Sequence, residues 1–391
     1  MGNILPATNI IFWELVNAFL TKFNEEKMKI KSLYKSLVLL GLVCVGTDHS
    51  YAQKIPMYIG TYTSGSNSEG VYIYDLNVKS GTSSLKQVIP MSNPSFLARK
   101  GDILYAVNED IQGKVTAYDL KNNVVLSQLE TGGAHPCHVA YSNSLPILLV
   151  SNYSGGSLSL YSLEQNGAIR KLEQHIQYSS SSVNKERQNA AHIHSAFLSE
   201  DGKRAYVSDL GGDLIYEYAI LKDGDDYKLE ELSRIQTKLG GGPRHMSFGR
   251  GNEIIYSVLE LTGEVEVFRN QNGAWKSIQV LPMFDTNFKG NQGAGDIKTS
   301  KNGKHVYATN RGDANVVLTY KVMKGGELLL ENILSVDGNS PRNLNMTPNN
   351  KWLFIGNQES NAVSVFKIGK NGRLKLSAEK IQIPKPVCVV F

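Results

Sequence analysis

Histidine, arginine and carboxylate side chains recur beside short apolar segments of this chain. One set stands at the start of such segments: His135, His138, His192, His194, Arg244, His245, Asp296, Arg342 and Asn343. A second set stands at the end of others: Asn108, Glu109, Asn152, Asp209, Glu260, Asn310, Arg311, Asn357 and Gln358. Histidine, glutamate and several arginines in one pocket suit the binding of an anion and the movement of a proton.

A metal site is a weaker interpretation of the same residues. His192 and His194 form an HxH pair, which places two imidazoles on one side of a strand, as in some metal sites. Zinc or calcium therefore stays open as an alternative. The chain lacks a tight ligand spacing such as HExxH, so we expect neither a metal ion nor another cofactor.

An internal repeat provides the elements that must position these residues. Seven short segments alternate apolar and polar residues and carry an aromatic near their end, at Tyr74, Tyr118, Tyr161, Tyr218, Phe268, Tyr320 and Phe366. A β-rich run precedes each segment. Upstream of these lie seven further apolar stretches, beginning near residues 94, 135, 192, 243, 295, 341 and 386. Spacings of this size match four-stranded propeller blades.

The order of the segments predicts how the fold closes. The last apolar stretch, residues 386–391, ends the chain, whereas the first outer strands lack an innermost partner before them. We therefore expect an all-β, seven-bladed propeller in which the N-terminal and C-terminal strands pair, which removes an open sheet edge. In such a blade the end of the second strand returns to the start of the innermost strand, so the two polar sets converge on one mouth.

Several of these polar residues also have a structural interpretation. Asn108, Asn152, Asp209, Asn310 and Asn357 occupy equivalent positions, which favours turns or hydrogen bonds between blades. His138 and His245 fit partly buried, hydrogen-bonded histidines as well as ligand-binding ones. Arg244, Arg311 and Arg342 are harder to explain structurally, since they repel one another unless an anion or Glu260 and Asp296 compensate.

Composition limits the partners and the compartment. The 391 residues carry a net charge of +5 that is spread along the chain, so nucleic acid is not an expected partner. Three cysteines without CxxC spacing indicate neither a disulfide framework nor structural zinc. We expect a small anionic molecule as the partner and no stable membrane partner. The sequence does not determine the oligomeric state.

The N-terminal region has the layout of a secretory signal peptide. From Met28, which we expect to be the start, a cationic stretch leads into an apolar run of eleven residues, SLVLLGLVCVG, and then to Ala52 as the expected cleavage site. The alternatives are a retained membrane anchor and a cytoplasmic chain. Residues 1–52 are thus expected to be an extension with a signal peptide, and residues 53–391 a single propeller of about 48 residues per blade in an exported, periplasmic or secreted protein.

The motifs YIGTYT, RQNAAHIHSAFLSEDGKRAYVSDLGGD, GGGPRHMSFG, GDIKTSKNGKHVYATNRG and PRNLNMTPNNKWLFIGNQ resemble those of the seven-bladed propeller lactonases, which include 6-phosphogluconolactonases and relatives of the carboxy-muconate lactonizing enzyme. The resemblance spans nearly all of residues 53–391. It implies a metal-independent lactone hydrolase with His194, Arg244, Glu260 and Arg311 as catalytic residues. Ala191 departs from the family pattern, where a proline commonly precedes the HxH pair. We add His192, His138, His245, Asp296, Arg342 and Gln358 as expected substrate-binding residues.

The expected mechanism leaves the general base open between Glu260 and His194. Either would activate a water that attacks the lactone carbonyl, while Arg244 and Arg311 hold a substrate anion and stabilise the oxyanion. An exported enzyme would rarely meet a cytoplasmic sugar phosphate, so an unphosphorylated lactone or another cyclic ester is an alternative substrate. A propeller that only binds is a further alternative. The Ser-rich segment 178–188 is interpreted either as a cover over the mouth or as a surface loop.

Overall fold

The computed structural model describes residues 14–28, 31, 54–285 and 287–391. They belong to two compact units, Met1–Gln53 and Lys54–Phe391. In the first unit, residues 14–28 form a helix, and no helix among the described residues is both long and apolar enough to cross a membrane. The apolar core of the expected signal peptide, residues 36–46, and the expected cleavage after Ala52 lie outside the described residues.

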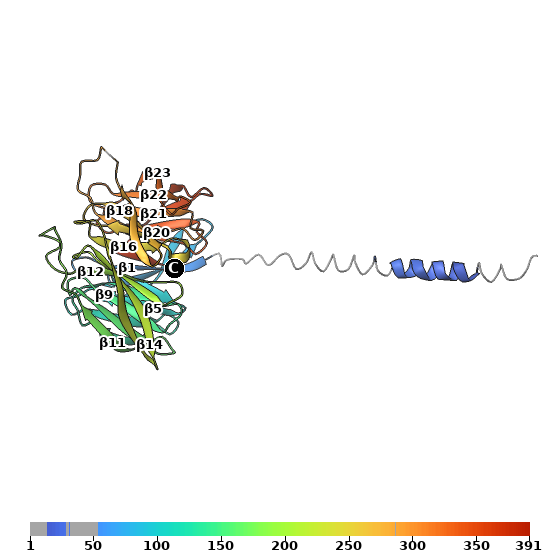
Figure 1. Cartoon of the computed structure of the whole chain (residues 1–391), viewed down its shortest axis with the longest axis horizontal. Helices are drawn as coiled ribbons and strands as arrows, with labels where there is room; N and C mark the ends of the chain where they lie inside the picture. Colours follow the sequence, from blue (N-terminus) through green and yellow to red (C-terminus); the bar gives the residue numbers. More distant parts are fainter. Residues whose placement is uncertain (1–13, 29–30, 32–53, 286) are drawn as a thin grey trace, which may run out of the picture. The chain divides into compact units, whose positions relative to one another are not determined.

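The second unit consists of seven four-stranded antiparallel sheets, the blades of a propeller (Figure 1). From the innermost strand outward, blade 1 contains β28 (Pro386–Val390), β1 (Lys54–Thr61), β2 (Gly70–Asn77) and β3 (Ser83–Pro90). Blade 2 contains β4 (Leu97–Lys100), β5 (Ile103–Asn108), β6 (Lys114–Asp119) and β7 (Val124–Glu130). Blade 3 contains β8 (Pro136–Tyr141), β9 (Ile147–Asn152), β10 (Ser157–Leu163) and β11 (Ile169–Gln177).

The other four blades repeat this order. Blade 4 contains β12 (Ile193–Leu198), β13 (Arg204–Asp209), β14 (Leu214–Asp223) and β15 (Asp226–Gln236). Blade 5 contains β16 (Pro243–Phe248), the 3-10 turn η1 (Arg250–Asn252), β17 (Ile254–Leu259), β18 (Glu264–Gln271) and β19 (Ala274–Pro282). Blade 6 contains β20 (Ala294–Thr299), β21 (His305–Asn310), β22 (Val316–Val322) and β23 (Leu328–Ser335). Blade 7 contains β24 (Pro341–Met346), β25 (Trp352–Asn357), β26 (Ala362–Ile368) and β27 (Leu374–Gln382).

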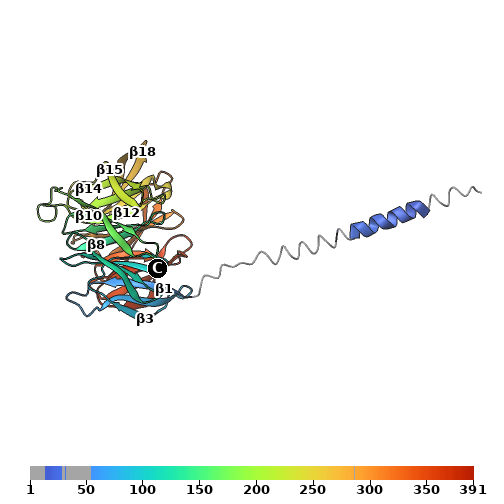
Figure 2. The same ribbon diagram turned by 90° about the horizontal axis from the view of Figure 1, so that it is seen from below.

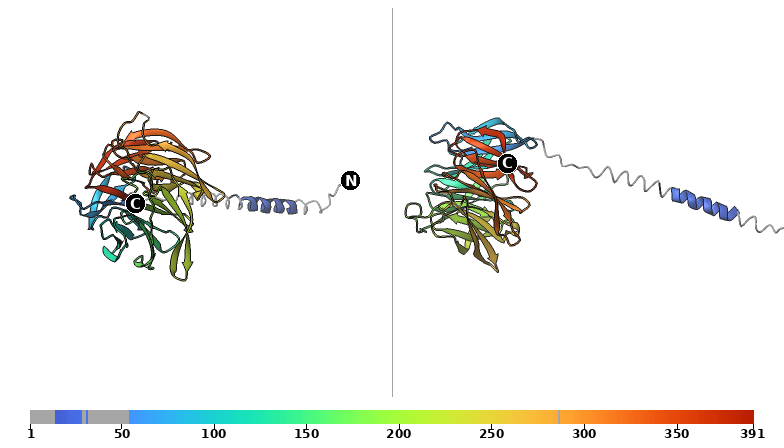
Figure 3. Two further views of the ribbon diagram at one scale, coloured as in Figure 1. Left: turned by 60° about the vertical axis from the view of Figure 1, so that its left-hand side comes forward. Right: turned by 90° about the horizontal axis from the view of Figure 1, so that it is seen from above.

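The ring closes as the sequence predicts. The C-terminal strand β28 pairs antiparallel with β1, with Tyr58 opposite Val390 and Ile59 opposite Val389. The blades follow one another around the domain in chain order, which the colours of Figure 3 trace from blue to red. Seen from below, β3 and β18 lie at opposite edges of the domain (Figure 2). Because β28 fills the innermost place of blade 1, the inner edge of β1 is paired and this blade has four strands like the others.

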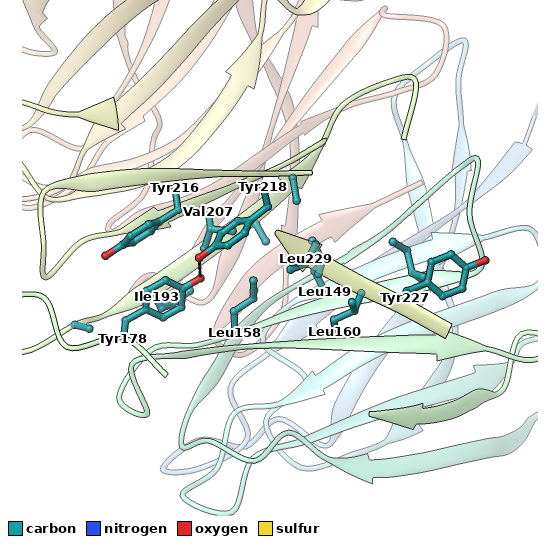
Figure 4. Packing of buried hydrophobic residues seen from close by; sticks show 14 residues of the cluster. Leu149, Leu158, Leu160, Tyr178, Ile193, Val207, Tyr216, Tyr218, Tyr227 and Leu229 are labelled. Carbon is teal, nitrogen blue, oxygen red and sulfur yellow. Dashed lines mark hydrogen bonds between the residues drawn. The ribbon is translucent and has the colours of Figure 1, made fainter. Parts of the chain in front are cut away.

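The core lies between neighbouring blades. The predicted aromatics of the third strands are buried, and Tyr161, Phe268, Tyr320 and Phe366 are almost wholly so. Figure 4 shows one such layer, in which leucines of blade 3 pack against Ile193, Val207 and tyrosines of blade 4. Alternation along each strand sends successive side chains to opposite faces, so every blade contributes apolar groups to both of its neighbours.

Innermost strands β8, β12, β16, β20 and β24 share an irregularity at their start. The register of their pairing shifts after Pro136, Ile193, Pro243, Ala294 and Pro341. A β-bulge of this kind bends the strand and re-aims a side chain. The residues that directly follow these five positions are Cys137, His194, Arg244, Gly295 and Arg342, and three of them are predicted site residues.

Candidate active site

The site begins at the bulges of β12, β16 and β24, which carry His194, Arg244 and Arg342. These residues come from different blades, yet they meet. Arg244 Nη1 donates to the backbone carbonyl of Gly295 in blade 6, and it lies 3.5 Å from the carbonyl oxygen of Arg342 in blade 7. The bulges therefore assemble side chains of separate blades at one end of the ring.

The residues that follow five of the seven second strands supply the other half of the site. Glu260 and Arg311 occupy this position, as do Tyr62, Glu109 and Tyr153. Each backbone N–H donates to a carbonyl just before an innermost strand: Glu260 to Gly242 at 2.7 Å, Arg311 to Gly293 at 2.8 Å, Glu109 to Asn93 at 3.0 Å, Tyr153 to His135 at 3.0 Å and Tyr62 to Lys385 at 3.2 Å. This repeated hydrogen bond brings strand ends and strand starts to one mouth, as the sequence predicts.

Glu260 is the centre of the charge network. Its Oε2 accepts a hydrogen bond from Arg244 Nε at 3.0 Å and forms an ion pair with Arg311 Nη2 at 2.9 Å. Its Oε1 accepts a hydrogen bond from Arg187 Nη2 at 2.8 Å. Burial by itself raises the pKa of Glu260, but attraction to Arg311 and Arg244 outweighs burial and holds this pKa well below its ordinary value. Glu260 is therefore a carboxylate at any pH near neutrality, and it is a poor base.

Arg244 is almost completely buried, with 2% of its side chain exposed. Burial, with repulsion from Arg311 and Arg342, lowers its pKa to about 9. Arg244 thus remains a cation at neutral pH. A buried cation needs compensation, and Glu260 with the Gly295 carbonyl provides it.

A second group of charges faces this one. Arg342 Nη2 donates to Tyr62 Oη at 3.0 Å, and that hydroxyl donates in turn to both oxygens of Glu109 at 2.9 and 3.0 Å. Ser95 also donates to Glu109. Burial raises the pKa of Glu109 despite the nearby Arg342. Arg187, Arg244, Arg311 and Arg342 thus lie near the carboxylates of Glu260, Glu109 and the buried Asp296. Four guanidinium groups outnumber three carboxylates, so the mouth keeps an excess of positive charge.

His194 is the imidazole closest to this charge network. Its Nε2 lies 3.9 Å from Glu260 Oε2, and its ring packs edge-on against Tyr153 and His245. Burial and the adjacent Arg244 hold the pKa of His194 well below 6.5. The imidazole is therefore neutral at physiological pH and can accept a proton.

The thiol of Cys137 lies next to His194 but is not activated. It donates to the His194 carbonyl at 3.1 Å and lies 3.9 Å from His194 Nδ1. Burial raises its pKa far above the ordinary value, which keeps it protonated and excludes an activated thiolate here.

A buried polar layer lies beside the charge network. His245 Nδ1 is 2.8 Å from Asp296 Oδ1, and Asp296 Oδ2 accepts hydrogen bonds from the Asn343 side chain at 2.7 Å and the Leu344 N–H at 3.1 Å. These contacts join β16, β20 and β24. His138 packs against the His245 ring, and burial lowers its pKa to about 3. The geometry of Asp296 and His138 favours a supporting role over direct contact with a ligand.

Two predicted binding residues lie apart from these contacts. The His192 ring stacks on Tyr153 with centroids 4.5 Å apart, and its Nδ1 lies 3.1 Å from the Tyr153 carbonyl oxygen. The side-chain amide of Gln358 donates to Glu359 at 2.9 Å. His192 borders the site through Tyr153, whereas no hydrogen bond or ion pair connects Gln358 to Glu260, Arg244 or Arg342 among the described residues.

Sequence reasoning missed Tyr62, Tyr153 and Arg187. Tyr62 and Tyr153 occupy the repeat position of Glu260, so an alignment of the second strands could have identified them. Arg187 lies in a connection without a repeat equivalent, and no periodic pattern marks it.

Three of the repeated polar residues that end the second strands link their blade to the connection from the preceding blade, and a fourth, Asp209, holds the turn of its own blade. The amides of Asn108, Asn152 and Asn310 donate to the carbonyls of Ser92, Thr131 and Met283. Asp209 accepts from three backbone N–H groups, those of His192, Gly211 and Gly212. These contacts support the structural interpretation of this set.

The metal alternative lacks a donor set in the described part of the chain. Within residues 14–28, 31, 54–285 and 287–391, no three His, Cys, Asp or Glu side chains are grouped so as to hold a metal ion. In the HxH pair, His192 stacks on Tyr153 while His194 Nε2 lies near Glu260, so the two imidazoles do not share a binding point.

The closed ring of seven blades, with an arginine-rich mouth around Glu260 and a neutral His194, is the arrangement expected of a propeller enzyme that acts on a small molecule. The family model for the seven-bladed β-propeller lactonases matches residues 56–391. The chain therefore belongs to this lactonase family and is a lactone hydrolase.

Individual relatives agree with this assignment. The 6-phosphogluconolactonases of Formosa agariphila and Bacillus subtilis are each 30% identical to this chain. The first match covers 80% of this chain and 92% of the relative, and the second covers 85% and 97%. The solved structure of a periplasmic gluconolactonase from Pseudomonas aeruginosa has a TM-score of 0.80 and 29% identity, and it covers 86% of this chain and 98% of its own.

Proposed function

We propose that this chain opens a sugar lactone of the 6-phosphogluconolactone or gluconolactone type to the corresponding aldonate. The excess of arginine over carboxylate at the mouth carries the proposal. The positive charge of Arg187, Arg244, Arg311 and Arg342 is one that a substrate anion or a developing oxyanion would neutralise. The names of the relatives support a sugar lactone as the substrate.

His194 is the general base in the proposed mechanism. His194 is neutral and its Nε2 makes no hydrogen bond among the described residues, whereas both oxygens of Glu260 are paired with arginines. His194 takes a proton from a water, whose oxygen attacks the lactone carbonyl carbon. Arg244 and Arg311 stabilise the resulting oxyanion. The bond between that carbon and the ring oxygen then breaks, the ring oxygen takes up a proton, and the acid product ionises.

The test measures acid release in a pH-stat with gluconolactone and with its 6-phosphate, after subtraction of spontaneous hydrolysis. We expect His194→Ala and Arg244→Ala each to lower kcat/KM by at least about tenfold, because a positioned proton acceptor or oxyanion donor contributes that much or more. Lys185→Ala, which changes an exposed lysine, is the matched control. Full activity in both site variants would contradict the assigned roles, and no acceleration of either lactone would contradict the substrate.

We also propose that residues 1–52 contain a signal peptide that starts at Met28 and is removed after Ala52, which leaves residues 53–391 as the exported enzyme. The cationic and apolar pattern of residues 29–46 supports this proposal, as does the likeness to a periplasmic gluconolactonase. N-terminal sequencing of the native protein should begin at Gln53. A protein that retains its N-terminal residues would contradict export by cleavage.

A further inference from the structure

The connection between β11 and β12, residues 178–192, reaches the candidate active site from outside the repeat pattern. It is held firmly at its ends. The Tyr178 hydroxyl lies 2.8 Å from that of Tyr218, both in a buried layer (Figure 4). The side chains of Ser182 and Gln188 both donate to the carboxylate of Asp213. The residues between Ser182 and Gln188 therefore form a short tip on a fixed base.

Asp213 also fixes the turn that precedes β16. Its carboxylate accepts the backbone N–H groups of Gly240 at 2.6 Å and Gly242 at 2.7 Å, in the turn that leads directly to Arg244. Gly240 and Gly242 have φ angles of +75° and +67°, which suit glycine. The Asp213 carboxylate thus fixes the position of the tip that carries Arg187 relative to the strand that carries Arg244.

Arg187 projects from this tip into the charge network. Its Nη2 donates to Glu260 Oε1 at 2.8 Å and to Tyr153 Oη at 3.1 Å. Its side chain is 45% exposed, compared with 2% for Arg244 and 14% for Arg311. Of the three arginines on Glu260, Arg187 alone belongs to a connection and not to the edge of a blade.

The two oxygens of Glu260 are shared unequally. Arg244 and Arg311 both bond Oε2, and Arg187 bonds Oε1. If Arg187 leaves Glu260, the carboxylate stays paired with two more deeply buried cations, so its charge is still compensated. Release of Arg187 therefore costs far less than release of Arg244, which would lose its carboxylate partner inside the protein.

We infer that Arg187 is a specificity-determining residue that moves from Glu260 to the negatively charged substituent of an anionic lactone. This inference rests on the proposed lactone hydrolysis and adds to it the preference for a charged substrate. A phosphate or carboxylate entering the mouth competes with Glu260 for the exposed guanidinium. The planar fork of arginine bonds such a group through two parallel N–H donors.

The experiment compares kcat/KM for 6-phosphogluconolactone and for gluconolactone in the full chain and in its Arg187→Ala variant. The ratio of the two values should fall by about tenfold to a hundredfold, because a hydrogen bond between charged groups contributes that much. Arg187→Lys keeps the positive charge but lacks the planar guanidinium fork. Its ratio should therefore lie between those of the full chain and of Arg187→Ala. Lys185→Ala removes a neighbouring exposed charge without touching Glu260 and should leave both rates unchanged.

An unchanged ratio in Arg187→Ala would overturn the inference. If both kcat/KM values fell by the same factor, Arg187 would be assigned to the support of Glu260. If the wild-type chain hydrolyses neither lactone, the proposed function fails on its own. Calorimetric titration with 6-phosphogluconate and gluconate then tests Arg187 separately. Weaker binding of the phosphate compound alone in Arg187→Ala supports the inference, and identical binding by both proteins overturns it.

Discussion

Glu260 Oε2 and His194 Nε2 lie 3.9 Å apart, but the two side chains differ in charge at neutral pH because their surroundings differ. Three arginines stabilise the charged form of Glu260, whereas burial beside Arg244 penalises the charged form of His194. At neutral pH the pair is thus a fixed anion beside a neutral imidazole. The sequence leaves the base open between them, and the hydrogen bonds to the carboxylate favour His194.

This assignment predicts the acid limb of the pH profile. Catalysis needs unprotonated His194, and its lowered pKa keeps that form populated below the ordinary histidine value of 6.5. We therefore expect kcat/KM for gluconolactone to stay constant from pH 8 to pH 6.5 and to fall only in more acidic solution. Initial rates between pH 4.5 and 8, corrected for spontaneous hydrolysis, check this. A half-maximal value at pH 6.5 or above would show that an unperturbed histidine is the base.

Neighbouring blades are connected by hydrogen bonds from buried tyrosines as well as by apolar packing. The hydroxyls of Tyr105, Tyr256 and Tyr307 on second strands donate to Gly167, Gly326 and Gly372, each in a turn of the following blade. These contacts hold the outer turns, while the bulges of β12, β16 and β24 hold the site at the centre. Stability and site geometry therefore depend on different parts of the same blades.

Two tyrosines of blade 6 permit a matched test of how much these hydrogen bonds between blades stabilise the protein. Tyr307 donates to the Gly372 carbonyl at 2.8 Å, whereas Tyr320 is equally buried and its hydroxyl has no hydrogen-bond partner among the described residues. Tyr307→Phe should lower the free energy of unfolding by about 1 to 2 kcal/mol, because a buried carbonyl loses its donor. Tyr320→Phe should cost close to nothing. Urea unfolding measures both, and equal losses would show that the hydroxyl of Tyr307 contributes no hydrogen-bond stability.

At the scale of the whole molecule, the closure of the ring also completes the site. Tyr62 follows β1 in blade 1, and Arg342 is the second residue of β24 in blade 7. Arg342 Nη2 donates a hydrogen bond of 3.0 Å to the Tyr62 hydroxyl. Trp352 Nε1 donates to the Val78 carbonyl across the same junction. The pairing of β28 with β1 thus positions residues of the mouth as well as protecting an edge.

Removal of β28 should therefore affect both folding and activity. A chain that ends at Lys385 leaves β1 with an unpaired inner edge, and we expect aggregation or a Tm lowered by more than about 10 °C, since an entire buried strand is lost. Phe391 lies outside β28 but packs against Phe354, so its deletion alone measures the loss of this contact separately from the loss of the strand. Thermal unfolding and light scattering measure the effect. A truncated chain that stays monomeric with an unchanged Tm would refute the role of closure.

The sequence by itself determined the all-β class, the seven repeats, all seven innermost strands and their closure by residues 386–391. Alternating apolar residues and turn residues are local features that recur once per blade, so they can be recognised without a structure. The same repeat placed Arg244, Glu260 and Arg311 at one mouth. Their catalytic roles stay predictions.

Only the tertiary structure decided which partners these residues have. The bulges re-aim His194 and Arg342 relative to simple strand alternation, and His192 consequently stacks on Tyr153 while His194 approaches Glu260. Arg187 comes from a connection that follows no period, so its contact with Glu260 depends on how residues 178–192 pack. The charge balance and the pKa values of the mouth follow from distances between blades, which a linear pattern does not contain.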